Sequence, residues 1–416
     1  MNAPAFASRD ALAEALRLQP LGEPAGNVTA ARGTLEGRVV HAALVENRTA
    51  SGAIGVAEAE KLSALFRVAA LQRSPLVLFL DSAGAKVSEG LAALGGFRHL
   101  YRAGLDAVFA GSPVAAVLGR NCFGGSSMLA FLARRRLFAP QSRLGMSGPA
   151  VIAAASGMNV LDEAFQAMAE AAMSPAARAG ASPLNTEWTP QLDLAEWLRT
   201  TLEPREEPIA IASAKRHEGL AARIPGTGAA RPWDSVRRAD LERIYPEGCA
   251  LEENGGLLRG IGRDAKGEAQ LVGLVGRQPL RAQRAWEFSD LVWRHVERPP
   301  ARLEVLLDCA SHAPSLEDER AVQSEYVVDM AFALATLARA GTQVGLTVLG
   351  QAGGGVYVAL AAPAARVSAV HGADIQVLPG AAVAAILGSS REALPSFDNY
   401  RAARVADEEL KLGLAP

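Results

Sequence analysis

The segment LVLFLD, residues 76–81, decides the fold class of this chain of 416 residues. It is continuously apolar and ends in an acid, which is typical of a strand buried on both faces of a parallel sheet. A glycine-containing loop, residues 82–85, follows it, and residues 86–102 have the apolar spacing of a helix. A second buried strand is predicted at residues 113–118. Strand and helix therefore alternate here as in an α/β domain.

The same order of segments recurs in the second half of the chain. The run LEVLLD, residues 303–308, again ends in an acid. A loop at residues 309–312, a helical stretch through Ala338 and the strand VGLTVLG, residues 344–350, follow it. We interpret the chain as a duplication of about 200 residues, in which each copy has a mostly parallel sheet flanked by helices.

Each copy also has a glycine cluster after its second strand. Gly124 and Gly125 occupy this place in the first copy, and residues 353–355 occupy it in the second. Residues 143–149 then read as a strand and turn, and residues 375–380 take the corresponding place downstream. The two copies differ in sequence and agree in the positions of their turns.

The boundary between the copies is predicted near residue 228. Residues 221–232 combine Gly, Pro and small side chains and are the best linker candidate. This divides the chain into domains at 1–228 and 229–416.

Each domain is predicted to open with an antiparallel hairpin. Residues 34–45 form the first, and residues 257–275, with a turn at 264–267, form the second. The first 20 residues carry two acids and no continuous apolar core, so they indicate a short amphipathic helix rather than a secretory signal.

Charge and cysteine usage exclude several classes of protein. Lys plus Arg number 42 against 44 for Asp plus Glu, so neither nucleic acid nor an anionic membrane surface is an expected partner. Cys122, Cys249 and Cys309 are far apart and show no CxxC spacing, which argues against a disulfide framework or a structural zinc site. A cytoplasmic location is the expectation. No cluster has metal-ligand spacing, so we expect no metal.

One uncharged stretch, residues 344–365, approaches the length of a membrane span. Its glycines at 353–355 and Pro363 favour a strand, a turn and a helix instead. We expect no membrane-spanning segment there.

The glycine clusters predict a chemical role for the main chain. A backbone amide can donate to an oxyanion only if no Cβ crowds the approach, so paired glycines at the start of a helix form a natural anion site. Two such donors can hold the oxygen of a thioester carbonyl as it gains charge, and one donor is worth about 2.7 to 4 kcal/mol. Glycine pairs at this position usually serve only tight turns, but two copies at matching positions favour catalysis. The candidate donors are Ala83, Gly84, Gly124, Gly125 and Ser126 in the first copy and Ser311, His312, Gly354 and Gly355 in the second.

Two competing nucleotide-binding motifs are absent. Dinucleotide binding requires GxGxxG directly after a strand, and neither loop has that spacing. A P-loop requires GxxxxGK[ST], which does not occur.

These residues resemble the crotonase-like carboxyltransferases. The segment DSAGAKVSEG, residues 81–90, resembles the acid, glycine pair, basic residue and Gln-Glu of that family. The segments CFGG at 122–125 and LGMSGP at 144–149 look closest to the β subunit of biotin-independent malonate decarboxylase. The second half, residues 303–380, is similar to the γ subunit.

The resemblance implies a fusion of two subunits with two crotonase-like (ββα-superhelix) domains. In that family the β and γ subunits remove CO2 from a malonyl thioester on an acyl carrier protein subunit, whose prosthetic group is phosphoribosyl-dephospho-CoA, without biotin. Loss of CO2 leaves an enolate, held by the first-domain loops, while the second-domain loops would hold the carboxylate or the departing CO2. CoA is the alternative carrier. Further expected partners are an acyl-carrier transferase subunit and a second copy of the chain in a homodimer. Expected substrate contacts are Arg120, Met146, Ser147 and Gly148.

The sequence departs from the family pattern at two positions. Ala150 stands where the family has the glutamate of Gly-Pro-Glu, and Ala83 replaces one glycine of the first pair. Residues 153–182 are rich in Ala and Met, so the acyl group is open between malonyl, methylmalonyl and larger. The alternatives are a biotin-dependent acyl-CoA carboxyltransferase component and a non-catalytic homologue that binds acyl carrier proteins.

Other side chains have both functional and structural interpretations. Cys122 has no His nearby in sequence to activate it, so burial as packing is favoured over a nucleophilic role. His312 would donate to a carboxylate or orient water, or else be a solvated loop histidine. Asp81 and Asp308 suit turn capping as well as chemistry.

A helix is predicted at residues 126–135, with a basic cluster at residues 134–136 near its end. Cations at this position suit the helix dipole or a phosphate-bearing cofactor. We favour a solvated helix end.

Overall fold

The computed structural model describes residues 4–158, 161–225, 235–378 and 394–412, and these form two compact units. Unit 1 comprises Met1–Glu89, His99–Ile209 and Pro314–Glu325. Unit 2 comprises Gly90–Arg98, Ala210–Ala313 and Tyr326–Pro416. Each unit thus includes one short segment from the other half of the sequence. The boundary predicted at residue 228 lies outside the described residues, and the division at that point remains a prediction.

Unit 1 is built on one mixed sheet. Within the described residues it has eight strands in the order β1-β2-β3-β4-β5-β6-β8, with β7 paired to β5. β1, β2 and β3 pair antiparallel, and all later pairs are parallel. The strands are β1 Gln19–Pro20, β2 Val28–Leu35, β3 Arg38–Val45, β4 Leu76–Ser82, β5 Val114–Phe123, β6 Arg135–Phe138, β7 Arg143–Gly145 and β8 Asn185–Glu187.

The apolar run at residues 76–81 is β4, and every residue of this strand is buried. β4 pairs in parallel with β3 on one side and β5 on the other. Both its faces and both its edges are therefore covered, which explains the absence of polar alternation. The strand predicted at 113–118 is too short, because β5 continues to Phe123. Its pairing with β4 shifts register between Leu80 and Ser82.

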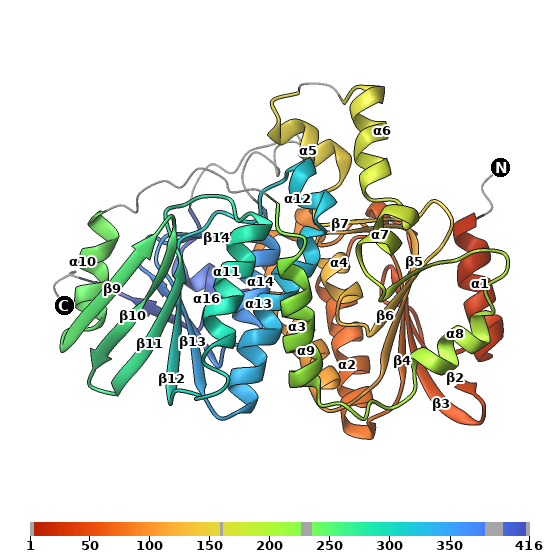
Figure 1. Ribbon diagram of the computed structural model, residues 1–416, viewed down its shortest axis with the longest axis horizontal. Helices are drawn as coiled ribbons and strands as arrows, with labels where there is room; N and C mark the ends of the chain where they lie inside the picture. Colours follow the sequence, from red (N-terminus) through yellow and green to blue (C-terminus); the bar gives the residue numbers. More distant parts are fainter. Residues whose placement is uncertain (1–3, 159–160, 226–234, 379–393, 413–416) are drawn as a thin grey trace. The chain divides into compact units, whose positions relative to one another are not determined.

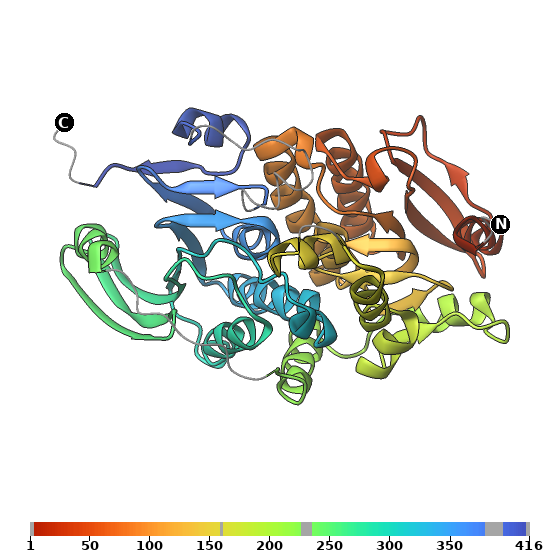
Figure 2. The ribbon, with the colours of Figure 1, turned by 90° about the horizontal axis from the view of Figure 1, so that it is seen from above.

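Helices cover the sheet of unit 1. α1 packs beside the first strands, as Figure 2 shows, and contributes Leu12 and Leu16 to a core that also contains Val77, Val117 and Trp197. The helical elements are α1 Pro4–Leu16, η1 Ala50–Gly52, α2 Val56–Gln72, η2 Val87–Glu89, α3 Gly90–Phe109, of which residues 90–98 belong to unit 2, α4 Gly125–Ala130, α5 Pro149–Ala155, α6 Glu163–Ala172, α7 Pro175–Ala181, α8 Leu194–Thr201 and α12 Leu316–Arg320.

Unit 2 has a second sheet of the same kind (Figure 1). Its order is β17-β15-β13-β12-β11-β10-β9, with β9, β10 and β11 antiparallel and the remaining pairs parallel. β14 and β16 form a separate parallel pair. The strands are β9 Gly248–Asn254, β10 Leu257–Asp264, β11 Gly267–Leu274, β12 Arg302–Leu307, β13 Gln343–Val348, β14 Gln351–Gly353, β15 Arg366–Val370, β16 Asp374–Gln376 and β17 Glu408–Leu410. The helices are α9 Ile209–Ala221, α10 Ser235–Ile244, α11 Ala282–Trp293, α13 Gln323–Arg339, α14 Gly354–Ala361 and α16 Phe397–Ala402; Ile209 in α9 and residues 323–325 in α13 belong to unit 1.

The predicted fold class and duplication are confirmed. In each unit an antiparallel hairpin (β2-β3 or β10-β11) leads into parallel strands (β4-β5 or β12-β13), as the two predicted hairpins require. The pairing of β5 with β7 recurs as the pairing of β14 with β16. Residues 375–380 were predicted to match the turn at residues 143–149, and the last two of them, Pro379 and Gly380, lie outside the described residues.

Two sequence predictions about residues 126–136 are wrong. α4 ends at Ala130, and the basic cluster begins β6 instead of ending a helix. Arg136 is only 2% exposed. It lies over the ring of Phe131 and donates to Asn185 Oδ1, so packing and hydrogen bonding replace the expected solvation.

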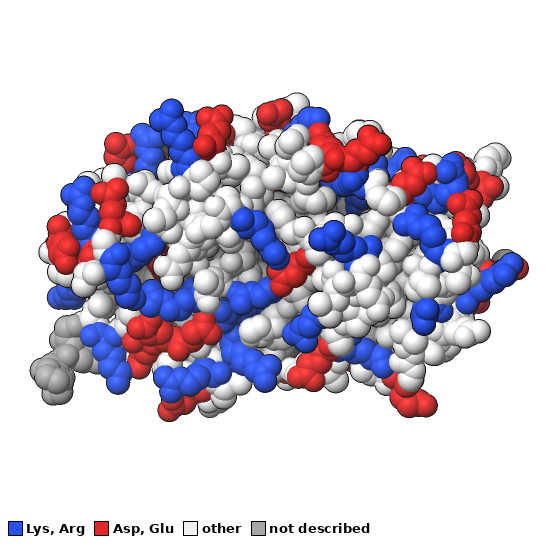
Figure 3. All heavy atoms as spheres, turned by 90° about the horizontal axis from the view of Figure 1, so that it is seen from below, with Lys and Arg blue, Asp and Glu red and all other residues white. Residues whose placement is uncertain are grey.

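The uncharged stretch 344–365 forms β13, β14 and α14, which confirms the predicted strand, turn and helix. In the part of the chain that the structure describes, no helix is long and apolar enough to span a bilayer. On the face drawn in Figure 3, Lys and Arg alternate with Asp and Glu and do not gather into a patch of one sign. This agrees with the nearly balanced charge count.

Candidate active site

The two predicted loops of unit 1 meet at the ends of β4 and β5. Gly84 has φ +98°, and a Cβ added there would lie 2.7 Å from the Phe123 carbonyl oxygen and 3.2 Å from the Gly125 nitrogen. The Ser126 hydroxyl donates to the carbonyls of Ser82, at 2.9 Å, and Phe123, at 2.7 Å. Only glycine at position 84 allows this approach.

Three of the predicted amide donors already have acceptors inside unit 1. The Ala83 amide donates to the Ser51 carbonyl at 2.9 Å, and the Gly84 amide donates to Ser82 Oγ at 3.1 Å. The Gly124 amide donates to the Gly145 carbonyl at 3.2 Å. These bonds make Ala83, Gly84 and Gly124 parts of the scaffold that shapes the loop.

The first turn of α4 holds the remaining donors. Its N-cap is Gly124, with φ 55°, and no side chain caps the helix. The amides of Gly125 and Ser126 have no partner inside the helix, and within the described residues neither donates to another protein acceptor. The anion-binding capacity of this loop therefore rests on Gly125 and Ser126.

Asp81 organises the strand ends beside this loop. Its carboxylate is buried and accepts the Asn121 amide at 3.0 Å. Burial raises its pKa, and the amides of Asn121 and Arg120 with the charges of Arg120 and Arg143 oppose that rise. The Arg120 side chain is exposed. The geometry supports the turn-capping interpretation of Asp81.

The predicted substrate-contact turn lies beside the same loop. Met146 and Ser147 are buried, and Gly148 is the N-cap of α5. A Cβ added at Gly148 would lie 3.6 Å from the Phe123 ring, which is ordinary van der Waals contact. The Met146 and Ser147 amides donate to Glu319 Oε2 and Oε1 at 3.1 and 2.7 Å. A carboxylate from the second half of the sequence thus binds the turn.

Glu319 and its partner Arg178 were not predicted from the sequence. Their side chains are 0% and 1% exposed, and Arg178 Nη2 lies 3.5 Å from Glu319 Oε2. Burial raises the pKa of Glu319 to about 7, although Arg178 and the two amides oppose the rise. No motif marks either residue, because the contacts join positions 141 to 173 residues apart.

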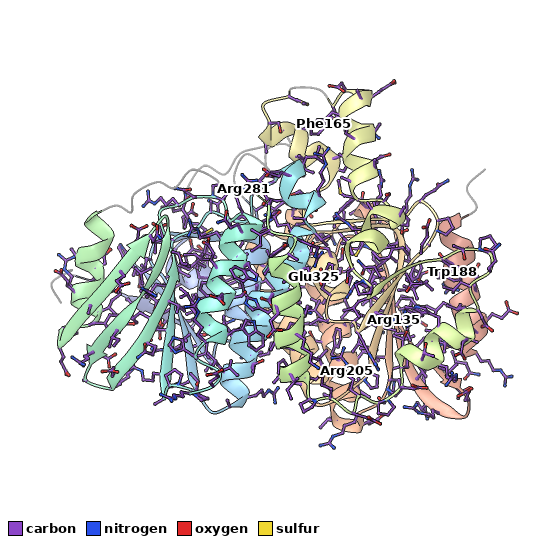
Figure 4. All side chains as sticks on the ribbon, viewed as in Figure 1. Arg135, Phe165, Trp188, Arg205, Arg281 and Glu325 are labelled. Atoms are coloured by element: carbon purple, nitrogen blue, oxygen red, sulfur yellow. The ribbon has the colours of Figure 1, made fainter. Side chains whose placement is uncertain are left out.

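An apolar cluster lies next to the turn. Phe165 on α6, marked in Figure 4, packs with Ile152, Ala153, Ala169 and Met173, and Phe123 and Leu316 lie against the cluster. The Ala- and Met-rich stretch, residues 153–182, thus contributes part of this cluster.

Unit 2 repeats the loop arrangement. Gly354 has φ +54°, and a Cβ there would lie 2.6 Å from Ser311 Oγ. The amide of Gln351 donates to Asp308 Oδ1 at 2.7 Å, as Asn121 does to Asp81. The isolated bridge between Leu280 and His312 repeats that between Ile54 and Ala85. The predicted residues Ser311, His312, Gly354 and Gly355 are therefore in one loop region, and no side chain caps α14.

His312 is 7% exposed, which rules out the solvated loop histidine. Its Nδ1 lies 3.2 Å from Ser311 Oγ. Burial lowers its pKa to about 4, so the ring is neutral at pH 7. A neutral ring can donate one hydrogen bond without adding charge to the loop.

The buried cysteines have the properties of packing residues. Cys122 and Cys309 are buried, and desolvation raises the pKa of each thiol to about 12. A thiol with such a pKa is a poor nucleophile at pH 7. Across the described ranges, no group of three or more His, Cys, Asp or Glu side chains is arranged to hold a metal ion.

The loops of unit 1, the turn beside them and β4, β5 and β7 lie within a segment that has known relatives. Residues 3–180 match the carboxyl transferase domain family. The methylmalonyl-CoA carboxyltransferase 12S subunit of Propionibacterium freudenreichii subsp. shermanii is 31% identical over 152 residues, 36% of this chain and 29% of the relative. The acetyl-coenzyme A carboxylase carboxyl transferase subunit beta of Bartonella grahamii is 32% identical over 127 residues, 30% and 42% of the two chains. The matches span less than half the length of these relatives.

Two solved structures align with the chain at lower identity. A Pseudomonas malonate decarboxylase hetero-tetramer in complex with malonate aligns with TM-score 0.45 and 20% identity, over 54% of this chain and 91% of that one. The transcarboxylase 12S structure with hydrolysed methylmalonyl-coenzyme A aligns with TM-score 0.39 and 20% identity, over 97% and 86%. The fold assignment rests on the strand pairing described above.

Proposed function

We propose that this chain decarboxylates a malonyl thioester to an acetyl thioester through an enolate whose oxygen accepts backbone N–H groups. The observation that carries the proposal is the uncapped amide pair of Gly125 and Ser126, which lies against Gly84 within the segment matched to the carboxyl transferase domain family. Such preorganised donors stabilise charge that develops on a carbonyl oxygen.

The proposed reaction needs no covalent intermediate. The bond between the α-carbon and the carboxylate breaks, and its electron pair forms the enolate C=C as the thioester carbonyl electrons move to oxygen. CO2 leaves, and a proton added to the α-carbon gives the acetyl thioester. The amides of Gly125 and Ser126 would hold the oxygen while it carries negative charge.

The repeated loop of unit 2 suggests a second anion-binding role. Its uncapped first turn of α14 contains the Gly355 amide, and Ser311 and the neutral ring of His312 lie in the same loop region. We assign these residues to the substrate carboxylate or the departing CO2. A neutral histidine can donate to the carboxylate without forming an ion pair that would hold it back.

The duplicated architecture supports a fused β- and γ-subunit chain of the malonate decarboxylase type. The acyl group would then arrive on the phosphoribosyl-dephospho-CoA group of an acyl carrier protein subunit, or on CoA, and an acyl-carrier transferase subunit would load the carrier. The exposed Arg120 beside Asp81 is the candidate contact for a carboxylate or phosphate of that carrier. Met146, Ser147 and Gly148 would line the acyl group.

A second candidate function is supported by the matched relatives. Both relatives named above are carboxyltransferase subunits. In a biotin-dependent acyl-CoA carboxyltransferase component, the α-carbon of the same enolate would attack the carboxyl carbon of carboxybiotin, and the bond from that carbon to the biotin nitrogen would break.

The test follows both products of a malonyl thioester labelled at the free carboxylate. Malonyl-CoA and a malonyl carrier protein are each incubated with the protein, with and without biotin. Equal release of labelled CO2 and acetyl thioester, independent of biotin, supports decarboxylation. Transfer of the label to biotin supports the carboxyltransferase, and carrier binding without turnover supports a non-catalytic role.

A further inference from the structure

The acidic segment 314–325 contains a buried carboxylate, Glu319, that has no role in the proposed reaction and binds the turn at Met146 and Ser147. It belongs to unit 1 although it follows β12 in the sequence, and Figure 4 marks Glu325 at its end. Ser315 caps α12 by accepting the Asp318 amide at 3.1 Å, and Ser324 Oγ lies 2.8 Å from Ser127 Oγ in α4. The segment is therefore anchored directly on the helix that carries the amide donors.

Glu319 binds the 145–147 turn with both carboxylate oxygens. Oε2 accepts the Met146 amide and Oε1 accepts the Ser147 amide, at 3.1 and 2.7 Å. Consecutive amides directed at one carboxylate fix the orientation of two peptide planes, because each bond is sensitive to angle. The turn cannot rotate without breaking both bonds.

Arg178 holds the backbone on both ends of this contact, and its Nη2 lies 3.5 Å from Glu319 Oε2. Its Nε and Nη2 donate to the Leu144 carbonyl at 2.9 and 2.7 Å, and its Nη1 donates to the Glu319 carbonyl at 2.6 Å. The residue before the turn and the residue that binds the turn are thus held by one planar guanidinium.

The turn transmits this constraint to the loop. Gly145 accepts the Gly124 amide at 3.2 Å, so the peptide that begins the turn also holds the N-cap of α4. Gly145 is closely packed, because a Cβ there would lie 2.8 Å from Glu319 Oε2 and 2.8 Å from Met173 Sδ. The path from Glu319 to the Gly125 and Ser126 amides therefore crosses two hydrogen bonds and one turn.

We infer that Glu319 is a positioning residue that holds the 145–147 turn, and through Gly145 the N-cap of α4, so that the Gly125 and Ser126 amides point at the substrate oxygen. This inference rests on the proposed function. Loss of alignment of one such donor lowers kcat by about 100-fold.

The test compares E319A and E319Q with E317Q, a matched control on the exposed face of the same helix. Hydrogen exchange of the intact protein is measured in peptides that cover 143–150 and 122–128. We expect E319A to speed exchange in both segments, E319Q to have a smaller effect and E317Q to have none. Faster exchange confined to 143–150 overturns the inference, because the constraint would then stop at the turn.

Turnover of the malonyl thioester provides the second readout. We expect E319A to lower kcat by about 100-fold with KM changed by less than about threefold, and E319Q to recover part of kcat. An unchanged kcat in folded E319A overturns the positioning role. If the wild-type protein shows no turnover, the proposed function fails, and the exchange pattern alone still decides whether Glu319 orders the loop.

Discussion

The hydroxyl of Ser126 donates a hydrogen bond of 2.9 Å to the carbonyl of Ser82, so the first turn of α4 is tied to the end of β4. This bond brings together two loops that are more than 40 residues apart in sequence. The close approach of Gly84 to Phe123 completes the contact. The position of the Gly125 and Ser126 amides therefore depends on both strands.

Gly84→Ala is expected to damage the loop beyond its effect on backbone strain. A Cβ at position 84 would lie 2.7 Å from the Phe123 carbonyl oxygen. Gly111→Ala is the matched control, since Gly111 has φ +92° and nothing within 4 Å of its Cβ position. Both substitutions should cost about 1 kcal/mol of unfolding free energy through the positive φ, and only Gly84→Ala should lower kcat by more than about tenfold. Urea unfolding and CO2 release measure the two effects; equal kcat values would contradict the account.

Glu319 is expected to make folding stability depend on pH. Burial raises its pKa from 4.5 to about 7, while Arg178 opposes the rise and Asp318 adds to it. A raised carboxyl pKa means that this contribution to stability is fully present below pH 4.5 and is lost as pH rises through 7. Between these two pH values the free energy of unfolding should fall by about 3 kcal/mol.

E319Q removes this titration. Urea unfolding at pH 5 and pH 8 should show a smaller difference between the two conditions in E319Q than in the wild-type protein. A larger or unchanged difference would show that Glu319 is already ionised at pH 5 in the folded chain.

The sequence predicted the sheet architecture because its strands lack polar alternation. The run at residues 76–81 is apolar throughout, and burial on both faces of β4 is the physical cause. The extension of β5 to Phe123 was missed because Arg120 and Asn121 interrupt the apolar run. Their polar side chains are tolerated where the strand leaves the core, because Arg120 is exposed and Asn121 Oδ1 accepts a hydrogen bond from Arg143 Nε at 3.1 Å.

The Glu319 contact could not be predicted from local patterns. Residues 316–320, LEDER, read as an ordinary charged helix, in which Glu319 is one of three acids in the first turn. Its burial follows from the way Arg178, Met146 and Ser147 surround it in the folded unit. Likewise, the glycine pattern indicated the donor loops, but which amides remain available depends on acceptors such as Ser51 and Gly145.

His312 is expected to lower stability in acid. Burial lowers its pKa from 6.5 to about 4, so the unfolded chain takes up a proton between these values while the folded chain does not. Stability is therefore lost as pH falls below 6.5. Between pH 6.5 and pH 5, the free energy of unfolding measured in urea should fall by about 2 kcal/mol less in H312Q than in the wild-type protein. Equal losses would mean that the ring is protonated in the folded protein.

Cys122 is expected to be inert in the folded protein. Its thiol is fully buried with a pKa raised to about 12, whereas Cys249 is partly exposed. Iodoacetamide at pH 7.5 should modify Cys249 first and leave Cys122 unmodified until urea is added, as followed by mass spectrometry. Rapid alkylation of Cys122 with parallel loss of turnover would revive the nucleophile hypothesis.

The most direct test of the enolate mechanism is CO2 release from malonyl-CoA and from a malonyl carrier protein by the wild-type chain, Gly125→Val and Gly355→Val. We predict that the wild-type chain releases CO2 and that both variants lose release while they keep the circular dichroism of the folded protein. Release by folded Gly125→Val at the wild-type rate, or no release by the wild-type chain from either substrate, would contradict the account.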